Sequence, residues 1–141
     1  MTGDGVALWT CPSCHRRFGR AGQAHECAPA VTLDEYFSTG PERERPIFEA
    51  VMRRLDPLGP VHVEPVSVGI LLKRTRSFAE LRPMMRWEAL WLTLPRLVVD
   101  RRISRTVGAS ARRVAHVIRL YGPDDVDDDV GGWLAEAYLD G

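Results

Sequence analysis

Long apolar runs are missing from this sequence, which excludes a membrane-spanning helix. Such a helix needs about 20 consecutive apolar residues, whereas the longest candidate, residues 89–94, has the length of a strand. Residues 1–10 also lack the basic start and the apolar stretch of a secretory signal. We therefore expect a cytoplasmic protein.

Cysteine and lysine are scarce, and the common catalytic motifs are missing. Three cysteines, an odd number, cannot all pair in disulfides. The single lysine, Lys73, has Leu71 two positions before it, so the acid-x-lysine element of many nucleases is lacking. There is no G-x-S-x-G, no glycine-rich phosphate loop and no H-E-x-x-H. We therefore predict a protein without catalytic activity.

The chain does contain a compact set of metal-binding residues near its N-terminus. Cys11 and Cys14 form a C-x-x-C pair, and His25 and Cys27 follow after ten intervening residues. Pro12 presets the backbone for a turn that lets both thiolates face one point. His25 and Cys27 point the same way on an extended segment but not on a helix. This pattern predicts a zinc ion held by three thiolates and one imidazole.

Other interpretations of the cysteines are a disulfide with a spare thiol and a redox-active pair, but neither a secretory signal nor a strand-to-helix context supports them. His15 could serve as an alternative ligand, but its position favours an ordinary surface histidine. Because four protein ligands leave no position for water, we expect structural zinc. A segment this short takes most of its folding free energy from the metal. We therefore expect a zinc-binding module with its tail and linker at residues 1–30 and a second domain at residues 31–141.

The hydrophobic pattern beyond residue 30 predicts helices first. Thr32 and Glu35 form a capping box that opens a short helix, which ends at Gly40. Pro41 suits the first position of a second helix. Apolar residues at three- and four-residue spacing continue this helix to Leu55.

Between residues 61 and 121 the apolar period becomes two, which indicates three to five strands. Residues 87–94 are apolar on both faces, as in a central strand. Residues 101–111 are basic and contain a glycine, which favours a loop. A final helix follows Pro123, with acids in its first turns that complement the helix dipole. The short connections predict an α+β domain, with a small antiparallel sheet packed against helices.

Basic residues are concentrated in the middle of the chain, although the net charge is zero. Residues 73–119 carry twelve basic residues against three acids, whereas the chain from Asp124 onward has seven acids and no base. Arginines beside an aromatic ring suit phosphate and base-stacking contacts, so we predict a surface for DNA or RNA. Arg74 and Arg76 are expected to share one face of a strand. The predicted contact residues are Arg74, Arg76, Arg82, Arg86, Trp87, Arg101, Arg102 and Arg105.

Two alternatives to nucleic-acid binding remain open. In the first, the chain is a protein-interaction or regulatory domain in which zinc only stabilises the fold. In the second, Arg74, Arg76, Trp87 and His116 line a small-molecule or enzymatic pocket. The apolar alternation around His116 instead predicts a core histidine bonded to a neighbour, with Arg119 on the other face of its strand.

Several motifs together resemble one known family. They are the cysteine segment at residues 9–27, T-L-D-E-Y-F at residues 32–37, the segment at residues 78–87, H-x-x-R at residues 116–119 and W-L-x-E-A-Y at residues 133–138. Over nearly the whole chain, the sequence resembles small bacterial proteins of a domain family of unknown function, some of which carry this zinc finger in front. The resemblance implies the α+β architecture and the zinc site, and it implies no established activity.

Overall fold

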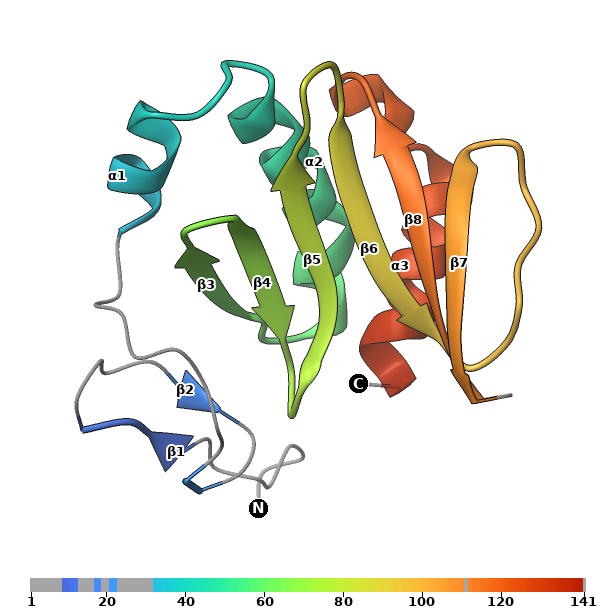
Figure 1. Ribbon diagram of the computed structural model, residues 1–141, viewed down its shortest axis with the longest axis horizontal. Coiled ribbons are helices and arrows are strands. Elements are labelled where there is room, and N and C mark those ends of the chain that lie inside the picture. The colour runs from blue at the N-terminus through green and yellow to red at the C-terminus, as the bar shows by residue number, and fades with distance from the viewer. Residues whose placement is uncertain (1–8, 13–16, 19–20, 23–31, 111, 141) are drawn as a thin grey trace.

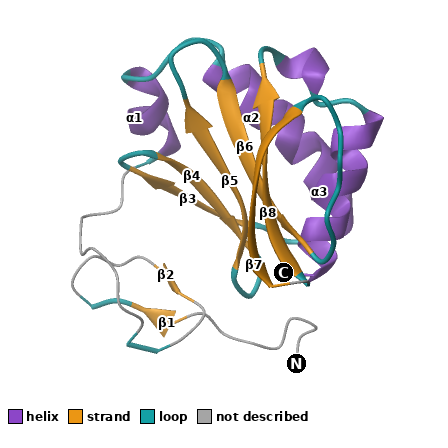
Figure 2. Ribbon diagram, turned by 45° about the vertical axis from the view of Figure 1, so that its right-hand side comes forward, coloured by secondary structure: helices purple, strands orange, loops and turns teal. Residues whose placement is uncertain are grey.

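The computed structural model describes residues 9–12, 17–18, 21–22, 32–110 and 112–140. Its centre is a six-stranded antiparallel sheet in the order β3-β4-β5-β6-β8-β7, with α2 and α3 against one face (Figures 1 and 2). The strands are β3 (His62–Val66), β4 (Gly69–Lys73), β5 (Ser77–Pro83), β6 (Glu88–Leu94), β7 (Ile103–Ser110) and β8 (Arg113–Leu120). The α+β prediction is confirmed.

The first two helices differ in how they begin. Helix α1 (Leu33–Ser38) has the predicted capping box, in which the Thr32 side chain accepts from the Glu35 N–H and the Glu35 carboxylate accepts from the Thr32 N–H. Helix α2 (Glu44–Leu55) begins three residues later than predicted. Pro41 instead starts a turn, and its carbonyl accepts from the Glu44 N–H at 3.1 Å.

The core lies between the sheet and the two long helices. Helix α3 (Asp128–Asp140) starts after a 3-10 turn at Pro123–Asp125, and the Asp127 carboxylate caps it by accepting from the Val130 N–H at 3.0 Å. Both helices bury one apolar stripe against the sheet. The fully buried side chains of the core include Ile47, Val51, Leu55, Ile70, Leu72, Leu90, Leu92, Leu94, Ile118, Leu120, Val130 and Leu134.

Helix α2 is followed by a 3-10 turn, Asp56–Leu58, and by a tight connection to β3. Gly59 has a φ of 144°, and a Cβ there would lie 2.5 Å from the Tyr138 hydroxyl. That hydroxyl donates to the Pro60 carbonyl at 3.1 Å. Only glycine therefore lets the end of α3 close onto this connection.

Strand β7 corrects the sequence prediction, which placed a loop at residues 101–111. It is an edge strand that pairs with β8 in a register including Thr106 opposite His116. Most of its side chains are exposed, so its sequence does not show the apolar alternation that predicts a strand. The strand forms nevertheless, because backbone hydrogen bonds to β8 do not depend on side-chain type. Its shifts in register and the charged side chain of Arg105 are features that keep an edge strand from pairing further. The sheet consequently has six strands, not three to five.

A two-stranded pair, β1 (Trp9–Thr10) with β2 (Arg17–Phe18), precedes the main sheet. Within the part of the chain that the structure describes, no helix is both long and apolar enough to cross a membrane.

Candidate nucleic-acid interface

The two faces of the main sheet differ because α2 and α3 cover only one of them. Leu90 and Leu92 on β6 are fully buried on the helix side. Side chains alternate along a strand, so Ala89 and Trp91 point to the opposite face. Trp87, which directly precedes β6, has the same parity.

The strand register places arginines around these tryptophans. Trp91 lies opposite Glu80 on β5 and Val117 on β8, and Val117 in turn lies opposite Arg105 on β7. In the next row Ala89 lies between Arg82 and Arg119. Residues directly opposite each other in antiparallel strands share a face. We call this surface the arginine–tryptophan face. It consists of Arg82, Trp87, Trp91, Arg105 and Arg119.

The guanidinium groups stack on the indole rings. The guanidinium carbons of Arg82 and Arg105 lie 5.4 and 6.0 Å from the ring centre of Trp91. That of Arg119 lies 4.2 Å from the ring centre of Trp87. These distances fall within the usual cation–π range of about 6 Å. The contacts hold the arginine side chains over the sheet surface.

Charge and exposure make this face suitable for an anionic, aromatic ligand. Arg105 and Arg119 are exposed, and both tryptophans are half-buried. Arg82 forms an ion pair with Glu80 on the neighbouring row, and among the described residues Glu80 is the carboxylate beside the three guanidinium groups. Guanidinium groups donate bidentate hydrogen bonds to phosphate, and indole rings stack on bases.

The turn between β5 and β6 extends the face at one end. It carries Arg86, which is exposed, and Met85, whose exposed fraction is 92%. Tyr121, after β8, has its ring 6.1 Å from that of Trp87. An apolar rim thus borders the arginine–tryptophan face beside Arg86.

Arg74 and Arg76 do not belong to this face, which corrects the prediction that they share a strand face. Strand β4 ends at Lys73, and both arginines lie in the turn that follows. Arg74 donates to the Tyr138 carbonyl at 3.2 Å and stacks 4.8 Å from that residue's ring, while Arg76 donates to the Asp140 carbonyl at 3.3 Å. They bind the last carbonyls of α3, where cations favour the helix dipole.

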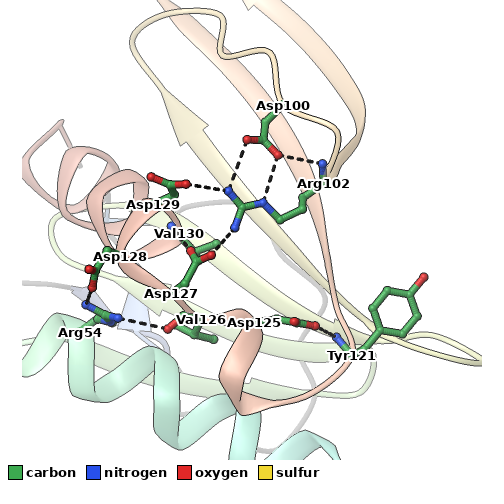
Figure 3. Close-up of polar contacts among 10 residues, drawn as sticks. All are labelled: Arg54, Asp100, Arg102, Tyr121, Asp125, Val126, Asp127, Asp128, Asp129 and Val130. Carbon is green, nitrogen blue, oxygen red and sulfur yellow. Dashed lines mark hydrogen bonds and ion pairs between the residues drawn. The ribbon is translucent and has the colours of Figure 1, made fainter.

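Arg102 is also bound within the fold (Figure 3). Its guanidinium pairs with Asp100 at 3.0 Å, Asp127 at 2.5 Å and Asp129 at 3.0 Å, and it lies 5.2 Å from the Trp133 ring centre. Hydrogen bonds that Arg102 donates to Asp100 and to the two other carboxylates raise the Arg102 pKa. This contact fastens the N-terminus of α3 to the start of β7.

Sequence reasoning therefore grouped residues that the fold separates. Of the eight predicted contacts, Arg82, Trp87 and Arg105 come together, Arg86 lies beside them in the turn, and Arg101 is an exposed residue just before β7. It omitted Trp91 and Arg119. Trp87 and Trp91 are four positions apart and so share one face of a strand, which would have indicated Trp91. Arg119 lies on the strand face away from the core histidine, which would have indicated Arg119.

The predicted zinc ligands are only partly described. Cys11, directly after β1, is buried and packs against Trp9. Cys14, His25 and Cys27 lie outside the described residues, as does the alternative ligand His15, so the four-ligand site stays a prediction. The donor set, three thiolates and an imidazole, fits zinc. No group of three metal-binding side chains occurs among the residues that the structure does describe.

The pair β1–β2 contacts the main sheet through Arg17. Its N–H donates to Glu64 Oε1 at 3.3 Å, and its carbonyl accepts from Lys73 Nζ at 2.7 Å. Glu64 and Lys73 are themselves a buried ion pair at 3.1 Å. Burial alone would raise the Glu64 pKa, but hydrogen bonds from His62 and Lys73 and the lysine charge lower it to about 2. The cysteine-containing segment therefore touches the β3–β4 half of the same sheet face.

A family model described as "Domain of unknown function (DUF5655)" matches residues 33–141. The chain belongs to this family. The match covers α1 to α3 and the six-stranded sheet, including the arginine–tryptophan face, and it begins after the cysteine segment. The predicted resemblance to a domain of unknown function is confirmed over these residues. No curated protein and no solved structure matches the chain.

Within the DUF5655 domain, His116 has a structural role. It is fully buried; its Nε2 accepts from the Val98 N–H at 2.9 Å, and its Nδ1 lies 2.9 Å from the Val114 carbonyl. The Val98 contact places the ring proton on Nδ1, which donates to Val114. The prediction of a core histidine is confirmed, and His116 lies on the face opposite Trp87.

Proposed function

We propose that this protein binds single-stranded nucleic acid through the arginine–tryptophan face. The observation that supports this most directly is Trp91, which lies near two guanidinium groups on the sheet face that α2 and α3 leave uncovered. A half-buried indole can stack on a base, while the arginines beside it donate to the flanking phosphates.

A single strand suits the face better than a duplex. The candidate contacts lie across β5, β6, β8 and β7, on a broad surface and not on a helix that could enter a groove. In single strands the bases are free to stack on aromatic side chains. Trp87 and Trp91 would provide two platforms, about 13 Å apart along β6.

We also propose that Cys11, Cys14, His25 and Cys27 hold a structural zinc ion, and that the protein works in the cytoplasm, where thiolates stay reduced. The contact of Arg17 with Glu64 and Lys73 would then place the zinc-binding module beside the binding surface. A structural metal there would stabilise the module without taking part in chemistry.

Fluorescence anisotropy of the full chain with labelled single-stranded and duplex DNA and RNA tests the proposal. We expect the single strands to bind more tightly, with an affinity that falls steeply as salt rises because counterions are released from phosphate. Two lysine replacements, Arg105→Lys and Arg119→Lys, keep the charge but lose the planar stacking, so they should weaken binding less than alanine does.

No binding of any oligonucleotide at low salt would overturn the proposal. Tighter binding to duplex than to single strands would overturn the stacking role of the tryptophans. In the first case, the exposed rim at Met85 and Tyr121 would make a protein partner the next subject of study.

A further inference from the structure

A second group of ionisable side chains is enclosed on the helix side of the sheet, away from the arginine–tryptophan face. Glu44 on α2 and Glu88 on β6 are both fully buried. Tyr36 on α1 donates its hydroxyl to Glu44 Oε2 at 2.7 Å. Arg43, just before α2, places its Nε 3.2 Å from Glu88 Oε2. The proton site formed by Tyr36, Arg43, Glu44 and Glu88 joins α1, α2 and the start of β6.

The charges in this group do not balance if both carboxyls are ionised, since one guanidinium would face two carboxylates. Within the described part of the chain, Glu44 Oε1 and both Glu88 oxygens have no well-aligned hydrogen bond. The strand neighbours of Glu88 are Pro83 and Leu120, which carry no charge, and the acid Glu80 acts on Tyr36. An unpaired buried charge is costly, and two adjacent carboxyls avoid it by retaining a proton.

The directions in which the pKa values of these side chains shift agree with this geometry. Burial, then the charge of Glu44, raises the pKa of Glu88 to about 8, although Arg43 acts in the opposite sense. Burial also raises the pKa of Glu44, although the hydrogen bond from Tyr36 and the charge of Arg43 act in the opposite sense. Burial and the bond to Glu44 raise the Tyr36 pKa, so its hydroxyl keeps its proton.

We propose that Glu44 and Glu88 bind a single shared proton and that this proton keeps α1 closed over them. Helix α1 is the weakest wall of the enclosure, because it has six residues and none of them is fully buried, whereas α2 and β6 lie in the core. A Cβ at Gly40 would lie 2.9 Å from Glu44 Oε1, so the link between the helices packs against this carboxyl. When the proton leaves, the second carboxylate needs water, and α1 moves out to admit it.

Arg43 connects this proton site to the rest of the sheet. Its guanidinium donates to the Trp87 carbonyl at 3.1 Å and also to the Met84 carbonyl in the β5–β6 turn. The inference does not depend on nucleic-acid binding, because opening of α1 is measurable without any ligand.

Amide hydrogen exchange of α1 in the full chain tests the proposal between pH 6 and pH 9.5, with rates corrected for the intrinsic pH dependence. If opening releases one proton, the protection of α1 should fall about tenfold per pH unit from pH 6 to about pH 8, because the pair holds the proton when closed and loses it when open, and it should level off above the raised pKa of about 8. Glu88→Gln cannot lose a proton and should keep the protection constant. Glu49→Gln, an exposed change on α2, should behave like the wild type.

A second measurement needs no variant and applies even if Glu88→Gln fails to fold. In carbon-13 NMR of the wild-type side-chain carboxyls, we expect one glutamate to titrate near pH 8, far above the ordinary value of 4.5. If every glutamate titrates below pH 6, or if the protection of α1 is independent of pH, the proposal is wrong.

Discussion

Arg102 and Arg105 lie three positions apart at the start of β7, yet they have different surroundings. Arg102 binds Asp100, Asp127 and Asp129, and its guanidinium lies over Trp133 on the helix side. Arg105 is exposed and lies over Trp91 on the open face. Both stack on an indole, but among the residues that the structure describes only Arg102 of the two has carboxylates around its N–H donors.

The partner of an arginine, more than its position in a basic stretch, decides its role. Three carboxylates satisfy the donors of Arg102 and leave little for a phosphate. A ring face restrains a guanidinium but leaves its in-plane donors available. Arg74 and Arg76 behave like Arg102, because their N–H groups donate to backbone carbonyls at the end of α3.

The largest expected effect is on binding, when the arginines over the tryptophans are reversed in charge. Replacing Arg82, Arg105 and Arg119 by glutamate should weaken single-strand binding roughly 100-fold or more, because three phosphate-binding cations become repulsive. Anisotropy titrations would measure this. The reversal Arg74→Glu with Arg76→Glu is the matched control, and an equal loss there would contradict the assignment of the face.

Trp91 and Trp133, the rings beneath Arg105 and Arg102, should differ in their effects on binding and on stability. Trp91→Leu removes a stacking platform and should weaken binding roughly 5- to 150-fold, on the basis of about 1–3 kcal/mol per stacked base. Trp133→Leu removes the ring beneath Arg102 and should lower stability while leaving the affinity unchanged. Urea unfolding and anisotropy on both variants check this, and equal losses of affinity would show that Trp91 has no special role.

Truncating the two arginines should affect stability unequally. Arg102→Ala leaves carboxylates unpaired at the start of α3 and should lower the free energy of unfolding by about 1–2 kcal/mol, a modest value since Asp127 and Asp129 are partly exposed. Arg105→Ala should change it by less than about 0.5 kcal/mol. Urea unfolding of both variants measures the difference, and equal effects would remove the distinction.

The smallest expected effect is a response to acid. Hydrogen bonds from Arg102 lower the Asp100 pKa, and the Val130 N–H, with Arg102, lowers that of Asp127. Their stabilisation is therefore complete above the ordinary value of 3.8 and is lost as the pH falls through the lower folded-state values. Indole rings do not titrate, so the contact of Arg105 should persist.

NMR signals of the arginine side chains, followed from pH 6 to pH 2.5, would test this response. We expect the Arg102 signal to shift below pH 3.8 before the Arg105 signal does. Simultaneous shifts would indicate global unfolding by acid and not loss of the carboxylate contacts.

The secondary structure could largely be predicted because local signals were strong. The capping box at Thr32 and Glu35, the apolar stripe of α2 and the alternation in β6 each depend on neighbours in sequence. The edge strand β7 could not be predicted, because its polar, exposed side chains resemble those of a loop. The same limitation applies to Arg74 and Arg76, whose surroundings depend on where β4 ends and where α3 terminates.

The sequence by itself determined the α+β class, the membership of a hydrophobic core that includes His116, and a cysteine–histidine set suited to zinc, since these follow from residue type and spacing. Only the tertiary structure decided which arginines meet tryptophan rings and which meet carboxylates. It also decided that Glu44 and Glu88, 44 positions apart, lie together beneath α1. Such contacts arise from strand register and helix packing, which bring together residues that no local pattern relates.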